Sequence, residues 1–91
     1  MMTTEITLDH PIEHNGEMIN TLHMRRPKVK DMMRVQQLNA AKTAEQREAK
    51  MFINLCEITP EFLEEMDMAD YFKLQQAYSG FLPSRSQLQE N

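Results

Sequence analysis

The sequence predicts an α+β domain in which an N-terminal β-hairpin is followed by a compact set of three to four helices. Two observations predict this fold. Alternating apolar and polar residues flank an Asn-Gly pair in the first quarter of the chain, and apolar residues at helical spacing follow capping signals in the rest. With 91 residues and 26% charged side chains, the chain suits one small globular domain. We expect the domain to span residues 1–82 and the polar residues 83–91 to form a flexible tail.

The hairpin is expected between residues 5 and 26. Apolar residues alternate with polar ones in the first strand, and Asn15-Gly16 tolerates the positive φ that both central residues of a type I′ turn require. Pro11 has no N–H for the ladder, which places the first strand at an edge or places Pro11 at a strand end. An isolated hairpin is only marginally stable. Helices must therefore cover one of its faces, or its edge must pair with a second copy.

Two helices are expected next. The first covers residues 28–40, with Pro27 in its first turn. Thr43, followed three residues later by Gln46, matches a capping box, so a second helix should begin there and run to about Glu57.

Two further helices complete the expected fold. Pro60, preceded by a threonine, begins a short third helix that should include Met66. Asp67, with Asp70 three residues later, is interpreted as the cap of a fourth helix, and Gly80 offers a left-handed stop.

The charges are divided into two opposed blocks. Residues 25–50 contain eight basic and three acidic side chains, whereas residues 57–70 contain six acidic and no basic ones, within a formal net charge of −4. Such a distribution can orient a partner or pair the chain head to tail with a copy of itself, so a homo-oligomer is possible. Two solvated helix faces are the alternative interpretation.

Catalytic and metal-binding patterns are weak in this sequence. His10 and His14 have the spacing of a helical metal site but fall in the predicted hairpin, and no thiolate or carboxylate spacing extends them toward His23. The single cysteine, Cys56, excludes an internal disulfide and is expected to be a buried apolar residue. We therefore expect no catalysis, no metal and no cofactor.

The expected location is the cytoplasm. One cysteine suits a reducing compartment, and the sequence shows neither a signal peptide nor an apolar run long enough to cross a membrane. We expect no membrane partner.

Methionine is unusually frequent, with nine residues in the chain. Methionine fills irregular gaps in cores, and it also lines adaptable grooves that receive partner segments. A core this thin cannot bury every large apolar side chain. The candidates for partner contact are Met32, Met33, Phe52, Tyr71, Tyr78, Phe81 and Leu82, several of which must belong to the core.

Two other function classes stay open. The basic segment 25–34 could contact DNA phosphates, as in a small DNA-binding regulator. The acidic total charge and the acidic residues that follow argue against a nucleic-acid partner. A generic protein-interaction adaptor is the second alternative.

The order of several short motifs resembles the tail assembly chaperone family of contractile-tailed bacteriophages and prophages. The similarity covers about residues 5–82 and includes a strand leading to Pro-Ile, a turn glycine, a second strand closing on Arg-Arg-Pro, a Pro-Glu helix start and an Asp-x-x-Asp-aromatic step. The residues that we assign a structural role from these motifs are Pro11, Gly16, Arg26, Pro27, Pro60, Asp67 and Asp70.

The resemblance implies a non-enzymatic chaperone. It would bind the tape measure protein before the tail tube polymerises around it and would be absent from the finished tail. The tail tube protein is a second candidate partner. Members of the family are commonly also made as a longer product by ribosomal frameshifting.

Overall fold

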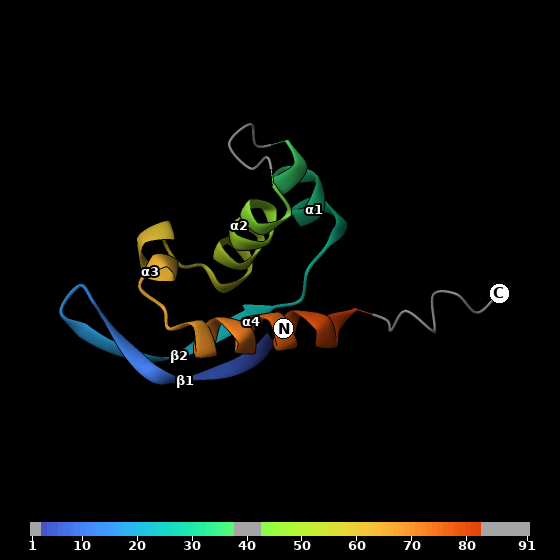
Figure 1. Cartoon of the computed structure of the whole chain (residues 1–91). Helices are drawn as coiled ribbons and strands as arrows, with labels where there is room; N and C mark the ends of the chain where they lie inside the picture. The colour runs from blue at the N-terminus through green and yellow to red at the C-terminus, as the bar shows by residue number, and fades with distance from the viewer. Residues whose placement is uncertain (1–2, 38–42, 83–91) are drawn as a thin grey trace.

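The computed structural model describes residues 3–37 and 43–82, and it has the predicted α+β architecture (Figure 1). A two-stranded antiparallel sheet is followed by four helices within these residues. The predicted tail, residues 83–91, and the predicted end of the first helix, residues 38–40, lie outside the described residues. The elements are β1 (Thr3–His14), β2 (Glu17–Arg25), α1 (Val29–Gln36), α2 (Ala44–Cys56), α3 (Pro60–Glu64) and α4 (Met68–Phe81).

The hairpin turn is confirmed. Asn15 has a φ of 53° and Gly16 a φ of 81°, and His14 pairs with Glu17 across the two-residue loop. Positive φ at both central positions is what the type I′ turn requires, and an Asn-Gly pair adopts it at little cost. Gly16 therefore has a conformational role at this position.

The first strand contains a large bulge that the sequence did not reveal. Between the pairs Thr7–Thr21 and Ile12–Ile19, residues 8–11 of β1 face a single residue, Asn20, of β2. Pro11 lies in this irregular stretch, where its missing N–H does not interrupt the ladder. Because the sheet has two strands, β1 is an edge strand, as Pro11 indicated.

The starts of α1 and α2 differ in how well they follow the sequence signals. Thr43 caps α2 as predicted, because its hydroxyl accepts a hydrogen bond from the Gln46 N–H at 3.1 Å and the Gln46 side chain accepts one from the Thr43 N–H at 3.2 Å. The prediction that Pro27 lies in the first turn of α1 is wrong. Lys28 is the N-cap, so Pro27 precedes the helix.

The two C-terminal helices require two further corrections. α3 ends at Glu64 and does not include Met66, although Thr59 and Pro60 start it as predicted. α4 does not stop at Gly80 in a left-handed conformation, because the helix continues to Phe81 and Gly80 has no positive φ. Leu82, in an extended conformation, follows it.

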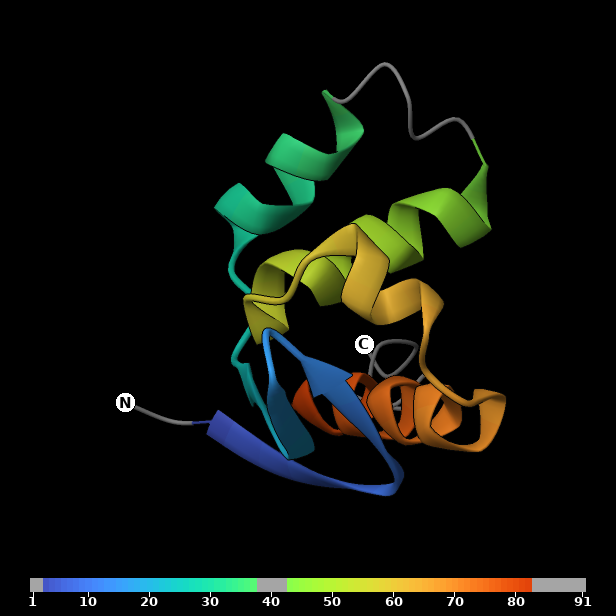
Figure 2. The ribbon, with the colours of Figure 1, turned by 90° about the vertical axis from the view of Figure 1, so that its left-hand side faces the viewer.

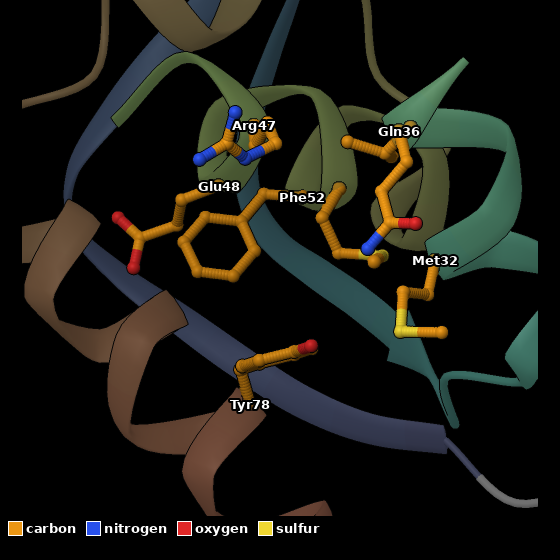
Figure 3. Close-up of a pocket in the computed structure, with 8 residues that line it drawn as sticks. Met32, Gln36, Arg47, Glu48, Phe52 and Tyr78 are labelled. Atoms are coloured by element: carbon orange, nitrogen blue, oxygen red, sulfur yellow. The ribbon is translucent and has the colours of Figure 1, made fainter. Parts of the chain in front are cut away.

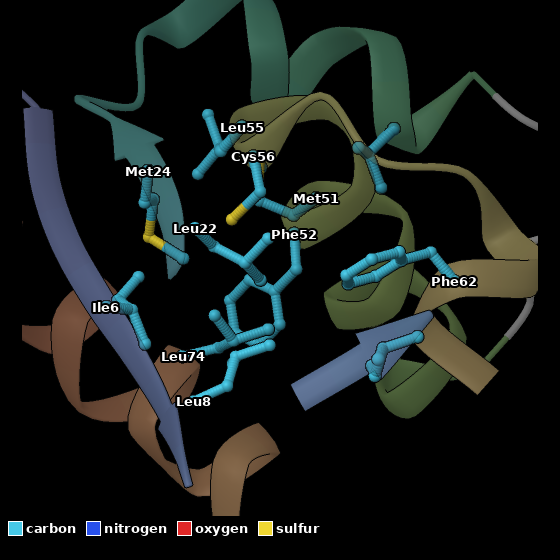
Figure 4. Packing of buried hydrophobic residues seen from close by; sticks show 12 residues of the cluster. Ile6, Leu8, Leu22, Met24, Met51, Phe52, Leu55, Cys56, Phe62 and Leu74 are labelled. Atoms are coloured by element: carbon cyan, nitrogen blue, oxygen red, sulfur yellow. The ribbon is translucent and has the colours of Figure 1, made fainter. Parts of the chain in front are cut away.

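The helices gather on one face of the hairpin, with α4 lying along β1 and α2 packing on β2 (Figures 1 and 2). The buried side chains of both strands alternate with exposed polar ones. Phe52 of α2 lies at the centre of the core (Figure 4). The buried apolar side chains are Ile6, Leu8, Ile12, Leu22, Met24, Val35, Met51, Phe52, Leu55, Cys56, Phe62 and Leu74.

Candidate partner-binding groove

A groove of about 250 Å³ lies where α1, α2 and α4 meet (Figure 3). Met32 and Gln36 reach it from α1, Arg47 and Glu48 from α2, and Tyr78 from α4. Val35, Met51 and Phe52 form the rest of its lining. The floor, formed by the buried Val35, Met51 and Phe52, is therefore apolar, while polar and charged side chains stand at the rim.

The sequence-predicted contact residues are divided between this groove, the open surface and the core. Met32, Met33 and Leu82 are exposed, with exposed fractions of 45%, 52% and 46%. Tyr71, Tyr78 and Phe81 are partly buried against the core. Phe52 is 0% exposed, so it supports the groove from beneath and belongs to the core rather than to the partner-facing surface. The expectation that the core cannot cover all the large apolar residues is confirmed.

An aromatic cluster fixes the floor of the groove. The Phe52 ring meets the rings of Tyr71 and Tyr78 edge to face, with centroid distances of 5.5 and 5.7 Å. The Tyr71 hydroxyl donates a hydrogen bond of 2.7 Å to Glu48, and Gln75 donates one of 3.0 Å to the same oxygen. Burial, together with the Glu48 carboxylate, raises the pKa of Tyr71, so the hydroxyl stays a donor and holds Glu48 at the rim.

The buried carboxylate of Asp31 positions α1 beside the groove. The Arg25 guanidinium binds it with two hydrogen bonds of 2.7 and 2.9 Å, and the Lys28 N–H and the Asn54 side chain donate two more at 2.8 and 2.9 Å. The Arg25 hydrogen bond is the largest of the causes that hold the pKa of Asp31 well below its ordinary range, against the opposing effect of burial. One carboxylate thus joins the end of β2, the start of α1 and the last turn of α2.

Sequence reasoning missed this assembly in part. It singled out Arg26 as the structural arginine, but Arg25 pairs with Asp31, while the guanidinium of Arg26 lies 5.6 Å from the centre of the Phe81 ring. That distance suits a cation–π contact at the end of α4. The role of Asn54 could not be predicted from the sequence, because its partner, Asp31, is 23 residues away in the chain.

Asp70 forms a second buried assembly at the β1 bulge. It was predicted to join Asp67 in capping α4, and this is wrong for Asp70. Asp67 caps the helix by accepting from the Ala69 N–H at 2.9 Å. Asp70 instead accepts hydrogen bonds from the backbone N–H groups of Asp9 and His10, at 2.8 and 2.9 Å, within the β1 bulge.

The residues considered for catalysis or metal binding have other surroundings. Cys56 is buried as predicted, and its burial raises the pKa of the thiol to about 11. The His14 ring packs edge to face on the Phe62 ring. His23 and Glu5 are exposed side chains of the hairpin, with 3.5 Å between His23 Nε2 and Glu5 Oε2. Within residues 3–37 and 43–82, no three metal-ligating side chains come together.

The basic segment proposed for DNA contact is partly engaged within the protein. Arg25 is held by Asp31, and Arg26 faces Phe81. Lys28, Lys30 and Arg34 are exposed. The described helices include none that is both long enough and apolar enough to cross a membrane.

Comparison with known proteins identifies one family. The family described as phage tail assembly chaperone proteins, E, or 41 or 14, matches residues 5–83, which is most of the chain. No curated protein matches the chain significantly, and no solved structure does so either. The match includes all of the hairpin except the first two residues of β1, both buried carboxylates and all the helices that form the groove. The chain therefore belongs to the family of phage tail assembly chaperones.

Proposed function

We propose that this chaperone binds the tape measure protein of its phage or prophage in the host cytoplasm, through the groove between α1, α2 and α4. The proposed role is binding without catalysis, and the protein leaves before the tail is complete. The observation that carries the proposal is that the exposed Met32 and the partly buried Tyr78 flank the apolar floor of this groove in a protein of this family. The tail tube protein is a further expected partner.

The chemistry of the groove suits a long helical protein with repeated apolar stripes. Methionine side chains change rotamer easily, so one groove can accept apolar side chains of different shapes at successive positions. A helix that lays an apolar face into such a groove places residues at positions i, i+3, i+4 and i+7 along it. The charged rim of Arg47 and Glu48 would meet the polar flanks of that helix.

Co-expression with the tape measure protein encoded nearby tests the proposal. The expected result is a soluble complex with several copies of the chaperone per tape measure protein, measured by pull-down and light scattering at low and moderate salt. Met32→Glu places a charge in the groove and should reduce recovery of the complex about tenfold, as expected when roughly 1.4 kcal/mol of apolar contact is lost. Met18→Glu is the matched control, because Met18 is 68% exposed and lies on the hairpin away from the groove.

Two outcomes would contradict the proposal. In the first, the tape measure protein aggregates while the chaperone stays free in solution. In the second, Met32→Glu and Met18→Glu recover equal amounts of complex although both unfold at the same temperature as the wild type. Binding of duplex DNA with a steep dependence on salt would instead support a regulator that uses residues 25–34.

A further inference from the structure

A second apolar groove lies on the other side of α2. Two adjoining hollows of about 300 and 260 Å³ share Ala49, Leu63 and Glu64, and together they run from α2 across α3 to the start of α4. Their remaining lining residues are Gln46, Lys50, Ile53, Pro60, Met66, Met68 and Tyr71. Met68, at 61% exposed, extends the apolar surface outward. This α2–α3–α4 groove is separate from the α1–α2–α4 groove described above.

The α3 side of the α2–α3–α4 groove is acidic: Glu64 lines the groove, and Glu61 and Glu65 lie beside it in the chain. Glu61, Glu64 and Glu65 are exposed, and none of them forms an ion pair with another residue in the described part of the chain. Lys50 is the cation among the lining residues. A segment that combines apolar side chains with neighbouring positive charges would therefore gain both burial and charge pairing here.

The outer face of α1 has this combination. Val29 and Met33, one helical turn apart, are 68% and 52% exposed. Lys30 and Arg34 follow each of them directly and are also exposed. The acidic residue of the helix, Asp31, points inward to Arg25, so it does not reduce the positive charge of this face.

The position of α1 directs its outer face away from the molecule's own second groove. α1 and α3 both pack near α2 but lie on opposite sides of it (Figures 1 and 2). The two complementary surfaces of one molecule therefore cannot meet each other, whereas those of two molecules can. Such a contact joins two different surfaces, so it is heterologous and can be repeated from copy to copy.

We propose that the outer face of α1 in one copy docks into the α2–α3–α4 groove of a second copy, which links the chaperone head to tail. Met32 and the groove proposed for the tape measure protein lie on a different side of α1 and stay accessible in the linked form. The contact surfaces are small, so the association is weak in free solution and increases with protein concentration. Because charge pairing contributes, it weakens as salt is added.

Sedimentation of the purified protein alone tests this inference independently of the tape measure protein. The wild type should increase in average mass with concentration at an ionic strength of about 0.01 M and lose this increase at about 1 M, where the screening length falls to about 3 Å. Glu64→Lys/Glu65→Lys changes the groove rim, and Met33→Glu/Arg34→Glu changes the outer face of α1. Each variant alone should stay monomeric.

Mixing the two variants gives the decisive result. Each retains the surface that the other has lost, so the mixture should form a 1:1 heterodimer and nothing larger. Glu13→Lys/Glu17→Lys is the matched control, because it makes the same charge change at exposed positions of the hairpin and should associate like the wild type. A wild type that stays monomeric at every concentration would overturn the inference, and so would variants that associate normally or a mixture that stays monomeric.

Discussion

Asp31, at the open end of the hairpin, and Asp70, at the β1 bulge, are both fully buried carboxylates, yet they are satisfied in different ways. Asp31 faces a cation, because the Arg25 guanidinium supplies two of its four hydrogen bonds. Asp70 accepts its two bonds from backbone N–H groups of the β1 bulge, and the nearest cation, Lys73, is 3.7 Å away and also binds Asp9 at 3.0 Å. The first site is a charge pair. The second replaces hydrogen bonds that the bulge has lost.

The difference shows how a small domain holds its helices in place. Polar groups supplement its thin core by fastening helices to the hairpin, and each carboxylate joins segments that are far apart in the sequence. Asp31 orients α1 beside the groove, whereas Asp70 fixes α4 on the bulge. Both thus hold helices that line the proposed partner surfaces, although neither carboxylate is accessible to a partner.

The largest expected effect comes from Asp31→Asn. The new amide places donors against the guanidinium and leaves Arg25 without its counter-charge, so unfolding free energy should fall by about 3 kcal/mol, as for other broken buried pairs. Chemical denaturation measures this loss. Asp9→Asn, at an exposed aspartate paired with Lys73, is the control and should change stability by less than about 1 kcal/mol. Equal losses in the two variants would contradict the distinction between buried and surface pairs.

Asp70→Asn should have a smaller effect, of about 2 kcal/mol, because one amide oxygen can still accept one of the two backbone hydrogen bonds. Hydrogen exchange at single amides distinguishes the Asp70 site from the Asp31 site. Hydrogen exchange of the Asp9 and His10 amides should accelerate more than global unfolding explains, while the amide of Lys28, which donates to Asp31, keeps its protection. Unchanged exchange at Asp9 and His10 would show that Asp70 does not hold the bulge.

The smallest expected difference between the two sites is in how much folding stability each loses at low pH. The pKa of both carboxyl groups is lowered in the folded protein, that of Asp31 farther than that of Asp70. A lowered pKa stabilises the fold at pH values above the ordinary value of 3.8, and this contribution is lost as pH falls below that value. For Asp31 the loss approaches about 1.4 kcal/mol per pH unit.

Denaturation at pH 6, 4 and 3 would measure this dependence. Asp31→Asn should flatten the acid limb of the stability curve more than Asp70→Asn does. A larger flattening in Asp70→Asn would reverse the assignment of the charge pair to Asp31.

Local signals in the sequence predicted much of the fold. The Asn-Gly turn, the Thr43 capping box and the Thr59-Pro60 start act between residues a few positions apart, so each is visible in the chain itself. The errors at Asp70 and near Gly80 occurred where a distant segment packs against the helix. Gly80 stays helical, and it lies beside Phe81, which packs against the core and under Arg26.

The candidate site was predicted less completely than the fold. Composition and resemblance directed attention to Met32, Met33 and Tyr78, and the structure places Met32 and Tyr78 in one groove. Helical spacing alone could not separate Phe52, which is buried, from these exposed residues, because burial depends on which helix faces lie against the hairpin. The acidic block of residues 57–70 likewise gave no indication that its glutamates border an apolar groove.

The sequence by itself determined the hairpin, the helix starts, the opposed charge blocks and the family, since all of these are encoded by neighbouring residues and their order. Tertiary structure alone decided that Asp70 serves the β1 bulge rather than its own helix, that Arg25 rather than Arg26 holds Asp31, and that α1 and α3 lie on opposite sides of α2. The physical reason is that buried polar groups must find partners wherever the packed chain supplies them, and the chain brings these partners together from distant positions.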